Sequence, residues 1–211
     1  MEPKALAPSL VDSFTEFDPA QITPDLVEVA LDHVLDNDII KDIPIVRTMI
    51  GVLKAATSIR DRALVKKLIR FLFSLGSVSS ETREQFKARM NVDEEFKKKV
   101  GEKLLLIVER LDDMSKPNLV AHAFQAYMEQ KIDFDMFQRL AGAIDKSFYS
   151  DLMALKSRGG SNALSPQAKL ELSNSGIIEL ESTPSINLSS RNNRYQTTEV
   201  GRHMLKFVLN S

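Results

Sequence analysis

The segment from Ile43 to Leu75 constrains the fold more than any other part of this chain. It is the longest apolar region, and between Pro44 and Gly76 it carries seven Lys or Arg residues and one acid, a net charge of +6. In its second half, a spacing of 100° per residue gathers one set of side chains on an apolar arc: Leu64, Val65, Leu68, Ile69, Phe71, Leu72 and Leu75. The opposite arc is basic and consists of Arg60, Arg62, Lys66, Lys67 and Arg70. This separation is typical of an amphipathic helix, which we expect to end at Gly76.

An almost uncharged stretch precedes that helix and is the best candidate for the centre of the core. From Ile45 to Thr57 only Arg47 and Lys54 are charged, which predicts a buried helix. The residues that we expect to be buried are Ile45, Val46, Met49, Ile50 and Leu53. We expect them to pack against a long helix over about residues 92–112, through Leu104, Leu105 and Val108.

The N-terminal segment has the opposite charge. Residues 1–43 carry two Lys and ten Asp or Glu residues, a net charge of −8. Three prolines and scattered acids within residues 1–22 predict a mobile acidic arm, after which a threonine–proline pair predicts the start of a helix. Because opposite charges attract at short range, we expect two helices to pack side by side. One bears Glu28, Asp32 and Asp36, and the other bears Arg62, Lys66 and Arg70.

The remaining pattern predicts a mainly α fold. Helical periodicity continues to about Lys156, and the loop SRGGSNALSP follows it. A short helix, two candidate strands and a last helix then complete the chain. We therefore expect a multi-helix body over residues 23–157 and a small C-terminal α+β module with one β-hairpin over residues 158–211.

This C-terminal module resembles a known superfamily. A helix ending in SGIIEL, a polar loop and then RYQTTEVGRHML resemble the winged helix-turn-helix superfamily over about residues 165–209. In that superfamily a helix runs into a β-hairpin wing, and a threonine–glycine turn opens the last helix. The resemblance implies nucleic-acid binding in many members and structural or protein-docking roles in others. The candidate nucleic-acid contacts are Lys169, Arg191, Asn193 and Arg194, but the charge of residues 151–211 is only +2.

Other classes of site lack a supporting pattern. The chain has no cysteine, which excludes disulfides and thiolate chemistry, and none of its histidines stands at metal-ligand spacing with another ligand. No phosphate-binding loop or nucleophile elbow is present in the sequence. We therefore expect no catalytic, metal-binding or cofactor-binding residues and no small-molecule substrate. We do not expect the protein to be an enzyme. The acidic N-terminus lacks the apolar core of a signal peptide, so we expect a cytoplasmic location.

Three functions remain open at this point. The first is a non-catalytic helical protein that docks to another macromolecule, either a protein partner or a second copy of the chain. The second is a winged-helix regulator that binds DNA through the residues named above. The third is a peripheral membrane effector that uses the basic amphipathic helices of residues 44–75, with Arg60, Arg62, Lys66, Lys67 and Arg70 facing the lipid or a partner.

Overall fold

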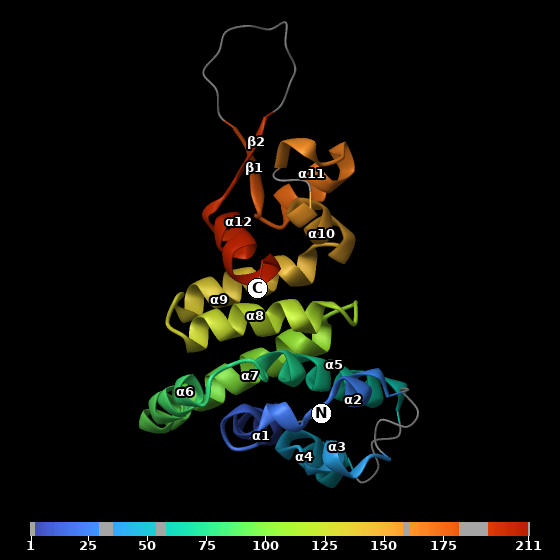
Figure 1. Ribbon diagram of the computed structural model, residues 1–211, viewed down its shortest axis with the longest axis vertical. Helices are drawn as coiled ribbons and strands as arrows, with labels where there is room; N and C mark the ends of the chain where they lie inside the picture. The colour runs from blue at the N-terminus through green and yellow to red at the C-terminus, as the bar shows by residue number, and fades with distance from the viewer. Residues whose placement is uncertain (1–2, 30–35, 54–57, 158–160, 182–193, 211) are drawn as a thin grey trace, which may run out of the picture. The chain divides into compact units, whose positions relative to one another are not determined.

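The computed structural model describes residues 3–29, 36–53, 58–157, 161–181 and 194–210 (Figure 1). Its chain divides into two compact units. Unit 1 comprises Met1–Lys131 and unit 2 comprises Ile132–Ser211. The described residues are mainly α-helical, and their only sheet is a two-stranded antiparallel hairpin near the C-terminus. The expected mainly α fold with a single C-terminal β-hairpin is therefore confirmed.

Unit 1 consists of helices. They are α1 (Pro3–Thr15), η1 (Pro19–Gln21), α2 (Pro24–Glu28), α3 (Asp38–Asp42), α4 (Pro44–Leu53), α5 (Ile59–Leu75), α6 (Ser80–Val92), α7 (Glu94–Arg110) and α8 (Lys116–Met128). Helix α1 packs against α7 and α4, and α5 packs against α8 (Figure 1).

The described residues 3–22 do not form the expected mobile arm, because α1 is a core helix of unit 1. Five of its apolar side chains are completely buried: Leu6, Ala7, Leu10, Val11 and Phe14. The Phe14 ring lies 5.2 Å from that of Phe124 and 5.9 Å from that of Phe86, measured between centroids. Pro8 lies inside the helix, where it removes one backbone hydrogen bond near the N-terminal end. Burial of the apolar face offsets this loss, so the prolines were a misleading signal.

The apolar arc predicted for the basic helix is confirmed in α5. All seven residues assigned to it are buried, and Ser58 caps the helix by accepting a hydrogen bond from the Asp61 amide at 3.1 Å. In α4, Ile45, Val46 and Met49 are buried as expected, while Ile50 is half-buried. The side chain of Leu53 lies outside the described residues. Helix α4 packs mainly on α1 rather than, as was expected, on the long helix α7. Helix α1 packs in turn on α7.

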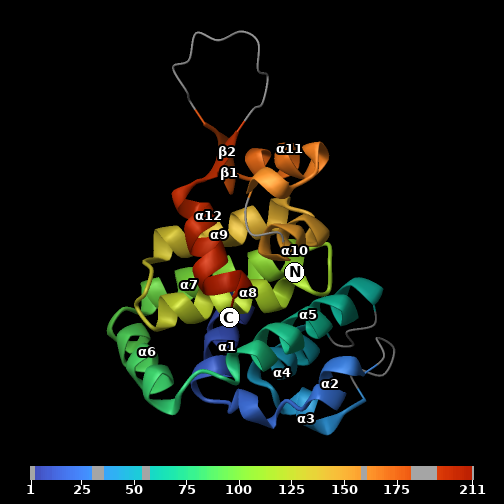
Figure 2. The same ribbon diagram turned by 45° about the horizontal axis from the view of Figure 1, so that its top comes forward.

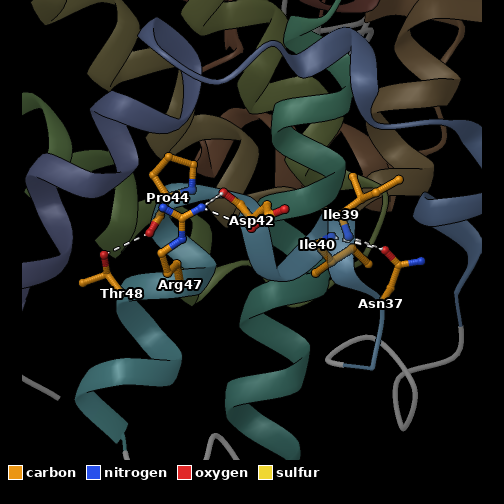
Figure 3. Close-up of polar contacts among 7 residues, drawn as sticks. All are labelled: Asn37, Ile39, Ile40, Asp42, Pro44, Arg47 and Thr48. Carbon is orange, nitrogen blue, oxygen red and sulfur yellow. Dashed lines mark hydrogen bonds and ion pairs between the residues drawn. The ribbon is translucent and has the colours of Figure 1, made fainter.

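Side-chain hydrogen bonds define the ends of α3 and the start of α4 (Figure 3). Asn37 caps α3 by accepting hydrogen bonds from the amides of Ile39 and Ile40 at 3.0 and 3.3 Å. At the following corner, Arg47 donates to the backbone carbonyl and the carboxylate of Asp42, both at 3.2 Å. These local contacts position α4 after the break at Pro44.

Unit 2 contains α9 (Phe134–Lys146), α10 (Tyr149–Ser157), η2 (Ser161–Ala163), α11 (Pro166–Asn174), β1 (Ile178–Leu180), β2 (Tyr195–Thr197), α12 (Glu199–His203) and the π-helical segment η3 (Met204–Leu209). The boundary between the units differs from the one expected at residues 157/158. Helices α9 and α10 belong with the hairpin because α12 packs on α9, while α11 and η3 pack on α10 (Figure 2). Because the helical periodicity of the sequence continues through α9 and α10, it could not show that these two helices belong to unit 2.

Thr198 joins the hairpin to α12. Its hydroxyl donates to the Gly176 carbonyl at 2.7 Å and accepts from the Gly201 amide at 3.0 Å. Gly176 adopts a φ of 77°, in the left-handed region that favours glycine. A Cβ atom at Gly201 would lie 2.1 Å from the Ile177 carbonyl oxygen, so the helix start and the strand entrance require a glycine here.

Candidate functional site

The exposed face of α11 is the strongest candidate site in unit 2. Ser165 caps this helix by accepting a hydrogen bond from the Ala168 amide at 3.2 Å, and Pro166 follows at the first helical position. Ala168 and Leu172 lie buried on the inner face. Leu170 lies on the opposite face and is 53% exposed. Its exposed neighbours on that face are Pro166, Gln167 and Asn174.

Lys169 lies on the side of α11 that faces the hairpin. Its Nζ atom is 5.8 Å from the centroid of the Tyr195 ring in β2, and the side chain is half-buried. Tyr195 pairs with Leu180 of β1, and the Tyr195 carbonyl accepts a hydrogen bond from Ser161 at 2.6 Å. Lys169 therefore contributes a cation–π contact that joins α11 to the hairpin.

Arg194 lies on the other face of the hairpin. Its backbone carbonyl accepts a hydrogen bond from the Glu181 amide at 2.8 Å, which extends the β1–β2 ladder by one pair. Because side chains alternate along a strand, Arg194 shares a face with Gln196, Glu179 and Glu181, whereas Tyr195 faces the opposite way. Gln196 donates to Glu179 on that face at 3.0 Å. Lys169 and Arg194 therefore do not converge, and Arg191 and Asn193 lie outside the described residues.

Two carboxylates lie on the other side of α11, and the sequence reasoning missed them as a pair. Asp151 of α10 is half-buried, and burial together with the nearby charge of Glu171 raises the pKa of its carboxyl. Glu171 accepts a hydrogen bond from Gln167 at 2.8 Å. One turn before Asp151, Phe148 is 58% exposed, and its carbonyl accepts from the Asp151 amide at 3.1 Å. Only the packing of α10 on α11 brings these residues together.

The basic face of α5, proposed above for a membrane or a partner, contacts other parts of unit 1. Arg60 forms an ion pair with the Glu109 carboxylate at 2.5 Å, and Lys67 donates to the Glu109 backbone carbonyl at 2.9 Å. Arg70 donates to the Met114 carbonyl at 3.4 Å and to the Glu28 carboxylate at 3.2 Å. Lys67 and Arg70 therefore donate to backbone carbonyls at and beyond the C-terminal end of α7, where the helix dipole also favours positive charge.

The remaining side chains of the basic face are partly buried. Burial lowers the pKa of the Lys67 ammonium, and the charges of Glu109 and Asp112 oppose that shift. Arg62 and Lys66, the other two members of the predicted set, are half-buried. The expected contact of the acidic helix with α5 is present at Glu28 and Arg70. The helix is shorter than expected, because α2 ends at Glu28 and Asp36 is not part of it, while Asp32 lies outside the described residues.

A buried lysine lies beside this region, and the sequence reasoning did not single it out. Lys116 at the start of α8 is 1% exposed and forms an ion pair with Asp112 at 2.5 Å. The hydrogen bond and the charge of Lys116 lower the pKa of the Asp112 carboxyl, although partial burial opposes them. In the sequence, the spacing of four residues between Asp112 and Lys116 was the only indication of this ion pair, and it was a weak one.

Neither a metal site nor a membrane span emerges from the described ranges. Across those ranges, no group of three or more His, Cys, Asp or Glu side chains could hold a metal ion. Within the same ranges, the helices lack an apolar stretch of the length needed to cross a bilayer.

Comparison with known proteins does not assign the chain to a family. No protein-family model matches it, and neither a curated protein nor a solved structure shows a match.

Proposed function

We propose that this protein is a non-catalytic interaction protein whose unit 2 docks to a protein partner through the exposed face of α11. The observation that carries the proposal is the position of Leu170, a large apolar side chain that is 53% exposed at the middle of that face. Burial of one such side chain against a partner is favourable, because it removes apolar surface from water.

The order of elements in unit 2 agrees with the winged helix-turn-helix resemblance. Helices α10 and α11 are joined through η2, and the hairpin and α12 follow them. In helix-turn-helix proteins the second helix of the pair presents the recognition surface. That role falls to α11 here, so the resemblance and the exposed Leu170 point to the same face.

The charges around α11 favour a protein over duplex DNA as the partner. A DNA-reading helix presents donors to base edges and cations to phosphates. Here Lys169 contacts Tyr195, Gln167 is hydrogen-bonded to Glu171, and the Asp151–Glu171 pair would repel phosphates. Arg194 lies on the hairpin face that also carries Glu179. A membrane-surface role has less support, since Arg60, Lys67 and Arg70 contact other parts of unit 1.

A peptide-display selection tests this proposal. The immobilised full-length chain would be used to select binders from a random library of peptides of about 15 residues, a length at which helices become stable. We expect selected peptides to bind the wild type and to lose about tenfold or more in affinity for Leu170→Glu, measured by fluorescence anisotropy. The matched control is Leu106→Glu, which alters a leucine of α7 that is 45% exposed.

Two outcomes would contradict the proposal. One is a selection that yields no peptide whose binding depends on Leu170. The other is tight, salt-sensitive binding of an arbitrary DNA duplex that Lys169→Ala and Arg194→Ala weaken, since each lost phosphate contact reduces the salt dependence by about one unit of slope.

A further inference from the structure

The carboxylates of Asp151 and Glu171 form a like-charged pair at the edge of the α11 face. Asp151 is half-buried, and the neighbouring charge that acts on it is that of Glu171, which has the same sign. Among the residues that the structure describes, no hydrogen bond or ion pair reaches the Asp151 carboxylate. Two adjacent carboxylates without a counter-charge favour a cation from outside the chain.

Exposed apolar residues accompany this acidic pair. Phe148 lies immediately before α10, three residues before Asp151, and is 58% exposed, while Leu170 precedes Glu171 on α11 and is 53% exposed. Helices α10 and α11 pack together, and the Ser147 hydroxyl beside Phe148 is hydrogen-bonded at 2.9 Å to that of Ser175, the residue that follows α11. The four side chains therefore lie in one region of unit 2. We call these four residues, Phe148, Asp151, Leu170 and Glu171, the α10–α11 patch.

The combination specifies the chemistry of the partner. An apolar side chain without a charge would leave the carboxylates unpaired at the edge of the interface, and an acidic segment would add repulsion. A basic segment without an apolar residue would leave Phe148 and Leu170 in water. Apolar anchors surrounded by matched charges are the usual arrangement of a helix bound to a surface.

We propose that the α10–α11 patch binds an amphipathic helix of a partner protein whose apolar anchor contacts Leu170 and Phe148 and whose adjacent Lys or Arg lies between Asp151 and Glu171. This inference rests on the proposed function and adds the identity of the partner segment to it. An arginine suits the position best, because its planar guanidinium can donate to both carboxylates at once.

The peptide selection described above tests this inference when it is repeated on the double variant Asp151→Asn/Glu171→Gln. Peptides selected by the wild type are expected to carry Lys or Arg within one helical turn of an apolar anchor. Their affinity should fall about tenfold or more on the double variant, the size of effect reached by close charge pairs. Replacement of the peptide's cation by glutamine should lower affinity for the wild type but not for the double variant.

The matched control is Glu179→Gln/Glu181→Gln, which removes the same number of charges from the hairpin face that carries Arg194. This control should leave peptide affinity unchanged. If Leu170-dependent peptides show no cation enrichment, or bind the double variant as tightly as the wild type, the inference is wrong while the proposed docking function stands. If no Leu170-dependent peptide is found, both are wrong.

Discussion

Gly101 of α7 lies directly against the backbone of Ala7 in α1. A Cβ atom at position 101 would stand 2.2 Å from the Ala7 carbonyl oxygen and 2.7 Å from its carbonyl carbon, so the two helices approach as closely as a glycine permits. This contact ties the N-terminal helix to the middle of unit 1. It also explains a glycine within an otherwise strongly helical segment, where alanine would have the higher helix propensity.

We expect Gly101→Ala to destabilise the protein by about 1–3 kcal/mol or more, because the clash is with backbone that has no alternative rotamer. The matched control is Gly142→Ala in α9, where an added Cβ would meet nothing within 4 Å. That control should be neutral or stabilising by up to about 1 kcal/mol, since alanine favours helix. Urea unfolding of both variants measures the difference, and equal stability of the two would show that α1 does not pack on α7 as described.

Phe14 should be an essential core residue although it lies near the N-terminus. Its ring contacts those of Phe86 and Phe124, and it is completely buried. We expect Phe14→Ala to cost about 3–5 kcal/mol in thermal or urea unfolding. The control Phe148→Ala removes an exposed ring and should stay within about 0.5 kcal/mol of the wild type. A mobile N-terminal arm would instead make Phe14→Ala as mild as the control.

The Asp112–Lys116 ion pair should make stability depend on pH at the acidic end. The pKa of Asp112 in the folded protein lies below its ordinary value of 3.8, so its ionised form stabilises the fold above that value. This contribution is lost as the pH falls through the folded-state pKa. Because Asp112 is 68% exposed, water screens the pair, so we expect Asp112→Asn to cost about 1 kcal/mol at neutral pH and less once the pH is below the folded-state pKa of Asp112.

The measurement is the free energy of unfolding of wild type and Asp112→Asn from neutral to acidic pH. Glu84→Gln, at an exposed position of α6, serves as the control and should have no effect at any pH. A cost of Asp112→Asn that stays constant down to the most acidic pH would refute the role of the ionised carboxylate. Lys116→Met should be far milder than Asp112→Asn, since it removes the buried charge itself.

Thr198 should stabilise the junction between the hairpin and α12. Its hydroxyl bonds to the Gly176 carbonyl and accepts from the Gly201 amide, so Thr198→Ala removes a helix cap and a tertiary contact. We expect a loss of about 1–2 kcal/mol, and a nearly complete recovery in Thr198→Ser, which retains the hydroxyl. Amide hydrogen exchange at Gly201 should be faster in the alanine variant only. Equal protection in both variants would rule out the cap.

The ion pair of Glu28 and Arg70 should contribute little, despite the large opposite charges of the two segments. Glu28 is 74% exposed, so Glu28→Gln should cost no more than about 1 kcal/mol, and that cost should vanish in about 1 M salt. Arg70→Met should cost more, because it also leaves the Met114 carbonyl without its donor. A large, salt-independent effect of Glu28→Gln would mean that the charges rather than apolar contacts hold α2 on α5.

Periodicity predicted much of the local structure because it reflects an intrinsic property of a helix face. The seven apolar residues of α5, the cap signals before several helices and the single C-terminal hairpin could all be recognised from residue type and spacing. Proline content misled the interpretation of residues 1–22, since one lost backbone hydrogen bond is small beside the burial of five side chains.

The sequence by itself therefore determined most of the helices after Pro44, the apolar face of α5 and the single hairpin near the C-terminus, but it did not reveal α1 as a core helix. Only the tertiary structure decided which helices meet: α1 against α7 at Gly101, α9 and α10 with the hairpin, and Asp151 beside Glu171. The reason is physical. The sequence pattern shows that a helix face is apolar, but it does not show which other apolar face packs against it. Residues such as Asp151 and Glu171 become neighbours only when two helices pack together.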